Sequence, residues 1–245
     1  MTLPLTGERT VPGIAEENYW FRRHEAAYLW AEPLAAGRTV LEVGCGEGYG
    51  TALLARSARH VVGIDYDALT VAHAQRNYPR AAFVRANLAA LPVPSHCVDV
   101  VVTLQVIEHV WDHGQFVREC LRVLRPGGLL LVTTPNRLTF SPGLDAPINP
   151  FHTKEFTASE LAALLTAHGF TLDETLGLHA GQRIAELDSK HDGFVTAQLA
   201  APPAEWTPGL LADVAGVAAA DFPVLPATRR EVDEALDLVL LARAR

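Results

Sequence analysis

An acidic residue and three glycines at alternate positions form the segment Glu42-Val-Gly44-Cys-Gly46-Glu-Gly48, a pattern that is typical of a ligand-binding loop. Glycine lets the backbone turn sharply and lets a ligand lie against bare main chain. An anionic side chain two residues before the first glycine suits a positively charged ligand better than a pyrophosphate. The segment therefore predicts a loop that binds a cationic or zwitterionic ligand.

Glu108, His109 and His152 are the candidates for proton transfer. Histidine titrates near neutrality, which suits a general base acting on a weakly acidic acceptor. Either histidine could be the base, and the Glu108-His109 pair could instead have a packing role. A hydroxyl acceptor is a weak acid, so a divalent ion such as Mg²⁺ would help to polarise it.

Strands and helices that could position these residues alternate along the chain. A β-rich run precedes the glycines, and a near-continuous apolar run at 98–103 predicts a strand buried on both faces. The alternation implies right-handed crossovers and a parallel sheet with helices on both faces. We predict strands at 39–43, 59–64, 82–85, 98–103, 128–134, 170–176 and 236–242, and helices at 14–34, 49–57, 68–77, 114–123 and 158–168.

The chain is predicted to form one domain over 1–245, with an N-terminal arm and helix at 1–37. A long loop at 136–155 is expected to be functional or disordered. It ends at a capping box in which Thr157 and Glu160 start a helix. Residues 180–230, rich in alanine and proline, predict a helical insertion before the last strand.

Composition limits the function classes. The formal charge is −8 and the pI is near 5.7, which argues against nucleic acid as the main partner. The three cysteines have neither metal-site spacing nor a disulfide framework, which indicates a reducing compartment. Because neither a signal peptide nor a bilayer-spanning segment is visible, we expect a cytoplasmic protein without a membrane partner.

The glycines do not fit the dinucleotide fingerprint G-x-G-x-x-G, because Tyr49 or Thr51 stands where the third glycine belongs. The spacing instead resembles motif I of the class I S-adenosylmethionine-dependent methyltransferases. Asp65, about 20 residues after Gly44, could accept both ribose hydroxyls or could cap a helix. Gln105-Val-Ile-Glu-His109 and Leu124-Arg-Pro-Gly-Gly128 also resemble segments of that family.

The resemblance implies a Rossmann-like, doubly wound α/β fold with a seven-stranded sheet, mostly parallel with an antiparallel last strand. It also implies S-adenosylmethionine as cofactor. Gln105 stands where some quinone-pathway relatives would have a third acidic metal ligand, so the metal requirement stays open. The residues that the resemblance assigns to cofactor binding are Glu42, Gly44, Cys45, Gly46, Gly48, Asp65, Tyr66, Asn87, Leu88 and Gln105.

Segments outside those motifs resemble a narrower group, the actinobacterial sugar O-methyltransferases of polymethylated polysaccharide pathways. They include 6–13, 17–24, 134–136 and the 141–153 region. This resemblance implies a small-molecule or oligosaccharide acceptor whose hydroxyl is methylated. A phenolic, quinone-precursor or natural-product acceptor is the alternative, and an oxidoreductase or a non-catalytic module would be a different class. The insertion could cover the acceptor or form a homodimer face, while Trp111 and Phe151 could stack on a sugar or lie in the core.

Overall fold

The computed structural model describes residues 3 and 9–245, and within them one sheet has eight strands. The strand order is β3-β2-β1-β4-β5-β8-β6-β7. Neighbours among β1 to β5 pair in parallel, whereas β8 runs antiparallel to β5 and β6, and β7 runs antiparallel to β6. The strands are β1 Thr39–Val43, β2 His60–Asp65, β3 Ala82–Arg85, β4 Val98–Leu104, β5 Leu124–Pro135, β6 Phe170–Leu178, β7 Val224–Pro226 and β8 Asp237–Ala244.

The prediction of seven strands is wrong, because the sheet has an additional strand, β7, at its edge. β7 lies inside 180–230, where we predicted helices, and pairs with β6 over three residues. A strand this short, with all three residues half-buried, leaves no alternating pattern in the sequence. The predicted helices of this segment are present as α7 Gln182–His191, α8 Phe194–Leu199 and α9 Pro208–Ala215.

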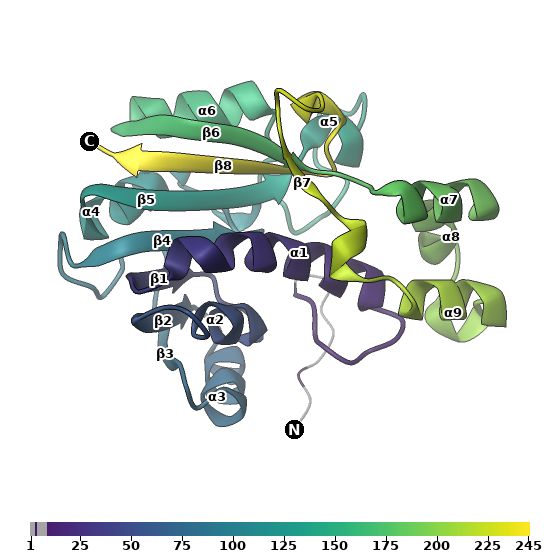
Figure 1. Cartoon of the computed structure of the whole chain (residues 1–245), viewed down its shortest axis with the longest axis horizontal. Helices are drawn as coiled ribbons and strands as arrows, with labels where there is room; N and C mark the ends of the chain where they lie inside the picture. The colour runs from purple at the N-terminus through teal and green to yellow at the C-terminus, as the bar shows by residue number, and fades with distance from the viewer. Residues whose placement is uncertain (1–2, 4–8) are drawn as a thin grey trace.

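Helices cover both faces of the sheet, as Figure 1 shows. On one face α1 and α2 pack in a core cluster that continues into α7, α8 and α9, and on the other α4 and α6 pack in a second cluster. The predicted capping box at Thr157 and Glu160 starts α6. The remaining α-helices are α1 Asn18–Ala35, α2 Tyr49–Leu54, α3 Ala68–Asn77, α4 His113–Val123, α5 Arg137–Phe140 and α6 Ala158–Ala167.

The central strands are buried on both faces, which confirms the prediction for the apolar run at 98–103. Val100 and Val102 of β4 belong to the cluster with α1, whereas Val101 belongs to the cluster with α4. Successive side chains of a strand point to opposite faces, so a strand covered by helices on both sides must be apolar throughout.

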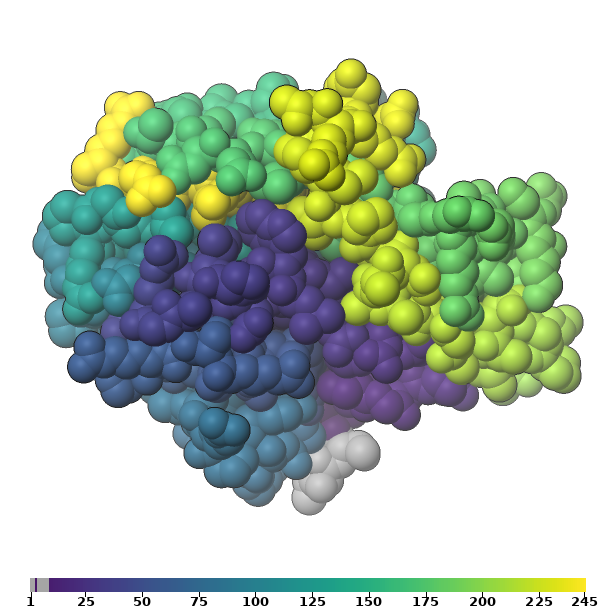
Figure 2. All heavy atoms as spheres, viewed as in Figure 1, coloured from purple at the N-terminus to yellow at the C-terminus, as the bar shows by residue number. Residues whose placement is uncertain are grey.

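The insertion forms a lobe beside the N-terminal half of α1, as Figure 2 shows. The Asn18 amide donates to the carbonyls of Val214, Ala215 and Val217 at the end of α9. Tyr19 makes edge contacts with aromatic rings of the insertion, Phe194 and Phe222. The insertion is therefore fastened to the first helix by both polar and aromatic contacts.

The predicted N-terminal arm at 1–13 is described only in part, because residues 1, 2 and 4–8, including the start of the 6–13 segment, lie outside the described residues. Among the described residues, no helix has the length and apolar character to cross a bilayer.

Candidate active site

The three glycines follow β1 directly, and all have positive φ, at 85°, 52° and 101° for Gly44, Gly46 and Gly48. A Cβ on Gly44 would lie 2.3 Å from Cγ2 of Val106, and one on Gly48 would lie 2.7 Å from Cβ of Ala74. Around Gly46 nothing lies within 4 Å of such a Cβ. Packing therefore requires glycine at the first and third positions, whereas Gly46 leaves open space for a ligand.

Glu42 lies behind the glycine loop and is fully buried. Its carboxylate accepts a hydrogen bond from Tyr28 Oη (2.5 Å) and another from Thr51 Oγ1. Burial raises the pKa of Glu42 to about 7. The carboxyl group thus joins α1, β1 and α2, and it is not among the residues that line the neighbouring cavity.

Asp65 joins the glycine loop to the end of β2. Its Oδ2 accepts from the Gly46 amide (2.9 Å), and its Oδ1 accepts from the Asp67 amide (3.0 Å). The helix cap is Asp67, which accepts from the Leu69 amide, so the alternative role of Asp65 as a helix cap is not realised. Asp65 instead fixes the backbone of the loop that contains Gly46.

Three other predicted cofactor residues lie on the adjacent strand ends. Tyr66 follows β2 with 62% of its surface exposed. Asn87 follows β3, and its Oδ1 accepts from the Ala89 amide (2.9 Å). Leu88 is half-buried against the cluster that includes α4. They follow Asp65 and Arg85 at the carboxyl edge of neighbouring parallel strands, where ligands of open α/β sheets bind.

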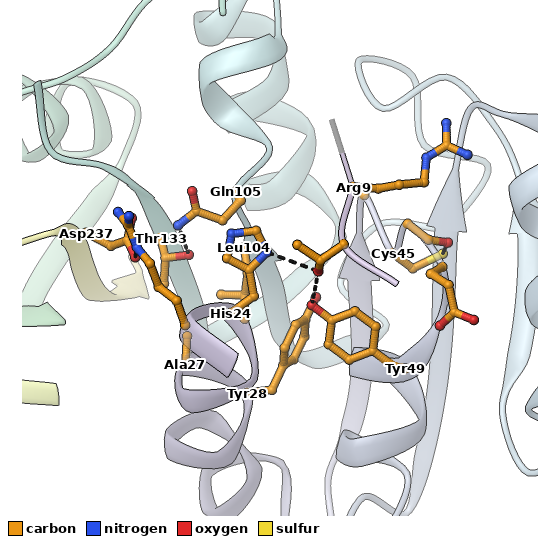
Figure 3. Close-up of a pocket in the computed structure, with 15 residues that line it drawn as sticks. Arg9, His24, Ala27, Tyr28, Cys45, Tyr49, Leu104, Gln105, Thr133 and Asp237 are labelled. Carbon is orange, nitrogen blue, oxygen red and sulfur yellow. Dashed lines mark hydrogen bonds and ion pairs between the residues drawn. The ribbon is translucent and has the colours of Figure 1, made fainter. Parts of the chain in front are cut away.

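A cavity beside the glycine loop brings together α1, the loop, the ends of β4 and β5, and the start of β8 (Figure 3). Of the predicted cofactor residues, Gly44, Cys45, Gly46 and Gln105 line it. The remaining lining residues are Arg9, Thr10, Arg23, His24, Ala27, Tyr28, Glu47, Tyr49, Leu104, Thr133 and Asp237.

Arg23 connects the first helix to the last strand in the wall of this cavity. Its Nε and Nη2 donate to the Asp237 carboxylate at 2.7 and 2.6 Å, and the guanidinium is 4% exposed. On the same helix, Tyr19 packs on the insertion, whereas Arg23 and His24 line the cavity.

Arg9 and Thr10 close this cavity from the N-terminal side. Thr10 Oγ1 is hydrogen-bonded to Tyr49 Oη (3.0 Å) and to His24 Nδ1 (3.4 Å), bonds drawn dashed in Figure 3. Arg9 donates to Asp67 and to Thr70 of α3 at 3.0 and 2.6 Å. The cavity volume is about 60 Å³, whereas ligand pockets usually measure about 300–1,000 Å³. With Arg9 and Thr10 in these positions the cavity has no room for a nucleoside.

The proton-transfer candidates follow β4 on a short 3-10 helix, Ile107–His109. Glu108 is 1% exposed and accepts from Thr134 Oγ1 (2.9 Å). Burial raises the pKa of Glu108 to about 8, with smaller contributions from Asp237 and Glu155. This carboxyl group is therefore largely protonated at neutral pH.

His109 and His152 come from distant segments and lie against each other, with ring centroids 4.9 Å apart. His109 Nδ1 lies 3.0 Å from the Phe151 carbonyl oxygen, to which it must donate, so its lone pair is on Nε2. His152 Nδ1 donates to Glu155 (2.8 Å), and its Nε2 lies 3.1 Å from the Asn149 amide nitrogen. Burial lowers the pKa of His152. These bonds place the lone pair of both histidines on Nε2; that of His109 is left to accept a proton, whereas that of His152 accepts from the Asn149 amide.

The long loop at 136–155 is ordered, because hydrogen bonds hold it to the segment that carries Glu108 and His109. Thr153 donates from its amide to the Glu108 carbonyl (2.7 Å) and from its hydroxyl to the Val110 carbonyl (2.6 Å). One ligand atom from each of Glu108, His109 and His152 lies within 4.8 Å of the others. The three predicted residues therefore form one cluster.

Sequence reasoning missed several residues that complete these sites. Glu155 is 3% exposed and holds His152, and the three-residue spacing between them was its only signal. Thr134 and Tyr28, which bind the two buried glutamates, have no signal in the sequence because they come from other elements.

Comparisons with known proteins agree on one family. Residues 41–132 match a family model described as a methyltransferase domain. A "probable S-adenosylmethionine-dependent methyltransferase" of Mycolicibacterium smegmatis is 57% identical over 243 residues, which cover 98% of this chain and 95% of the relative. A ubiquinone biosynthesis O-methyltransferase of a Methylobacterium species is 30% identical over 196 residues, covering 72% and 78%. A Thermotoga maritima crystal structure, titled as a methyltransferase and possible histamine N-methyltransferase, matches with a TM-score of 0.62 at 18% identity, covering 92% and 93%.

Proposed function

The chain belongs to the S-adenosylmethionine-dependent methyltransferases, and on that premise we propose that it methylates a hydroxyl group of a sugar or oligosaccharide. The observation that carries the proposal is the cluster of Glu108, His109 and His152 at the end of β4. The methyl group of a sulfonium is already activated, so the enzyme must place the acceptor and remove its proton. A sugar hydroxyl needs a base more than a phenol does, because it is far less acidic.

His109 is the proposed general base. The Phe151 carbonyl holds its Nδ1 proton, so Nε2 faces the reaction as the proton acceptor. His152, oriented by Glu155, lies against this ring and could receive the proton or hold the acceptor. Glu108 is the buried carboxyl group of this cluster, and it is hydrogen-bonded to Thr134.

The cofactor is proposed to lie along the glycine loop, against Gly44, Cys45, Gly46 and Gln105, in space that it gains when Arg9 and Thr10 move aside. Asp65 and Tyr66 would contact the ribose, and Asn87 and Leu88 the adenine. Glu42 and Gly48 would act by fixing the loop, because Glu42 is buried behind it and Gly48 is packed on α3. The proposal treats 1–245 as one methyltransferase domain.

A divalent ion fits the cluster of Glu108, His109 and His152, called the reacting cluster from here on, only in part. Glu108, His109 and His152 offer one carboxylate and two imidazoles. This donor set suits transition ions such as Zn²⁺ or Fe²⁺, whereas Mg²⁺ prefers oxygen ligands, so the predicted Mg²⁺ is the poorer fit. A bound ion would lower the pKa of the acceptor hydroxyl.

A phenolic or quinone-precursor acceptor is the second candidate, which the similarity to a ubiquinone biosynthesis O-methyltransferase favours. The test is a radiolabelled methyl-transfer screen against sugars, short glucans and mannans, and phenols, with added Mg²⁺ or with chelator. Label in a saccharide supports the proposal, and label confined to phenols contradicts it. The predicted cytoplasmic location and homodimer stay predictions.

A further inference from the structure

Exposed apolar side chains are concentrated beside the reacting cluster. Ten large apolar side chains are exposed among the described residues, and five of them lie on two segments next to His109. One is Trp111, which is 89% exposed two residues after His109. The other four lie on α5 and the loop that follows it, namely Leu138 (41%), Leu144 (50%), Ile148 (62%) and Phe151 (47%). An exposed apolar surface of this kind marks a binding site more often than a chance exposure.

Hydrogen bonds from side chains to backbone carbonyls hold the two segments together. The carbonyl of Phe151 accepts from the His109 ring, and the Thr153 hydroxyl donates to the carbonyl of Val110. Within the loop, the Ile148 amide donates to Ser141 Oγ (3.1 Å). The backbone at Trp111 and the loop therefore have fixed positions relative to the proposed base.

The charge of this surface disfavours an anionic ligand. The only charged side chain in 138–151 is Asp145. The flanking cations are both directed to Glu160, which lies 3.5 Å from Arg137 and 3.9 Å from Lys154. A phosphate or carboxylate group on the acceptor would have to compete with Glu160 for these two cations.

The openness of the surface distinguishes between neutral ligands. A phenol or quinone ring gains its binding energy from enclosure, usually with 70–90% of its surface buried. Side chains that are 41–89% exposed cannot enclose such a ring. A pyranose ring, in contrast, can place its C–H face on an indole while its hydroxyls stay in water.

We propose that Trp111, Ile148 and Phe151 form an acceptor platform that binds the non-reacting rings of a neutral saccharide. The inference rests on the proposed function and extends it, because it assigns the residues that select the acceptor. Binding to the platform would place one hydroxyl of the saccharide at His109.

Calorimetry with a neutral gluco-oligosaccharide and a manno-oligosaccharide, on protein saturated with S-adenosylhomocysteine, tests the platform without needing turnover. We expect Trp111→Ala to raise the dissociation constant about tenfold, or about 1.4 kcal/mol. Trp111→Phe should retain most of the affinity because a ring remains. Leu199→Ala is the matched control, since Leu199 is 72% exposed on α8, and it should change nothing.

Three results would overturn the platform: no binding of either saccharide by the wild type, unchanged affinity in Trp111→Ala, or tighter binding of a phosphorylated gluco-oligosaccharide, titrated in the same way, than of the neutral one. Circular dichroism checks that the variants fold. Saccharide binding that depends on Trp111, without methyl transfer to any saccharide, would support the platform and refute the proposed function, so the two failures are distinguishable.

Discussion

The glycine loop and the reacting cluster lie at the same edge of the sheet, but contacts of different range build them. The loop is held by hydrogen bonds across short stretches of sequence, from Gly46 to Asp65 over 19 residues and from Thr51 to Glu42 over nine. The reacting cluster depends on His109 to Phe151 over 42 residues and Thr153 to Glu108 over 45. The glycine loop is therefore encoded by nearby residues, whereas the cluster of Glu108, His109 and His152 forms only after the long loop has docked.

Replacing the proposed base should separate the two regions most strongly. We expect His109→Ala to lower kcat for a saccharide about 1,000-fold, because general base catalysis contributes about 10²–10⁴. Binding of S-adenosylhomocysteine should be unchanged, since the cavity residues are untouched. His168→Ala is a matched control, because this half-buried histidine also bonds a backbone carbonyl through Nδ1.

If His109→Ala weakened S-adenosylhomocysteine binding as much as it lowered kcat, the glycine loop and the reacting cluster would form one energetic unit. A loss of less than about tenfold in kcat would instead favour a phenolic acceptor, which ionises more easily and needs the base less.

Two glycine substitutions sharpen the comparison within the loop. Gly44→Ala should destabilise the fold by about 3 kcal/mol, because its Cβ would overlap Val106. Gly46→Ala should cost only about 1 kcal/mol for its positive φ. It should nevertheless weaken S-adenosylhomocysteine binding about tenfold, because its Cβ would occupy open space at the cavity. Urea denaturation and calorimetry measure the two effects, and the opposite ranking in stability would contradict the packing argument.

The local region is also the one that the sequence predicted best. The glycine spacing, Asp65 and the capping box at Thr157 depend on neighbours within one or two elements, so their residue types carry the information. Most strand positions followed from hydrophobic runs. Strand β7 could not be predicted, because three residues added to a sheet edge have no period.

The acceptor side was predicted residue by residue but not as a geometry. Glu108, His109 and His152 were candidates by type, yet only the docking of Thr153 on Glu108 and Val110 brings them together. Glu155 and Thr134 were missed, because a partner from a distant element has no mark in the sequence. The closure of the cavity by Arg9 and Thr10 was missed for the same reason.

The buried carboxyl groups predict that the stability of the fold depends on pH, and the first of them, Glu42, lies behind the glycine loop. Burial raises the pKa of Glu42 from 4.5 to about 7 in the folded state, so the folded protein keeps a proton that the unfolded chain loses. The resulting contribution is full below about pH 4.5 and is lost as pH rises through about 7, which lowers the free energy of unfolding by about 3 kcal/mol. Glu108, with a pKa of about 8, acts in the same direction.

Glu42→Gln should therefore flatten the decline in stability between about pH 5 and about pH 8, measured by urea denaturation. The exposed Glu205→Gln is the control and should leave the slope unchanged. A slope that Glu42→Gln does not alter would show that Glu42 ionises normally in the folded protein.

The smallest expected effect concerns the closure of the cavity. Arg9→Ala removes the bonds to Asp67 and Thr70 that hold Arg9 where it leaves no room for a nucleoside, so we expect S-adenosylhomocysteine to associate about fivefold faster in stopped-flow measurements. Arg38→Ala, which removes an exposed bond to the Leu34 carbonyl, serves as the control. An unchanged association rate would mean that Arg9 does not limit entry.

The ion pair between Arg23 and Asp237 joins residues 214 positions apart in the wall of the cavity. During translation the glycine loop leaves the ribosome long before Asp237 does, and domains generally fold as units. Until the last strand is inserted between β5 and β6, the Arg23 guanidinium has no anion and the wall of the cavity is incomplete. With the cofactor in the proposed site, loading of a nascent chain with S-adenosylmethionine would report that Asp237 has been synthesised and that the final strand has joined the sheet.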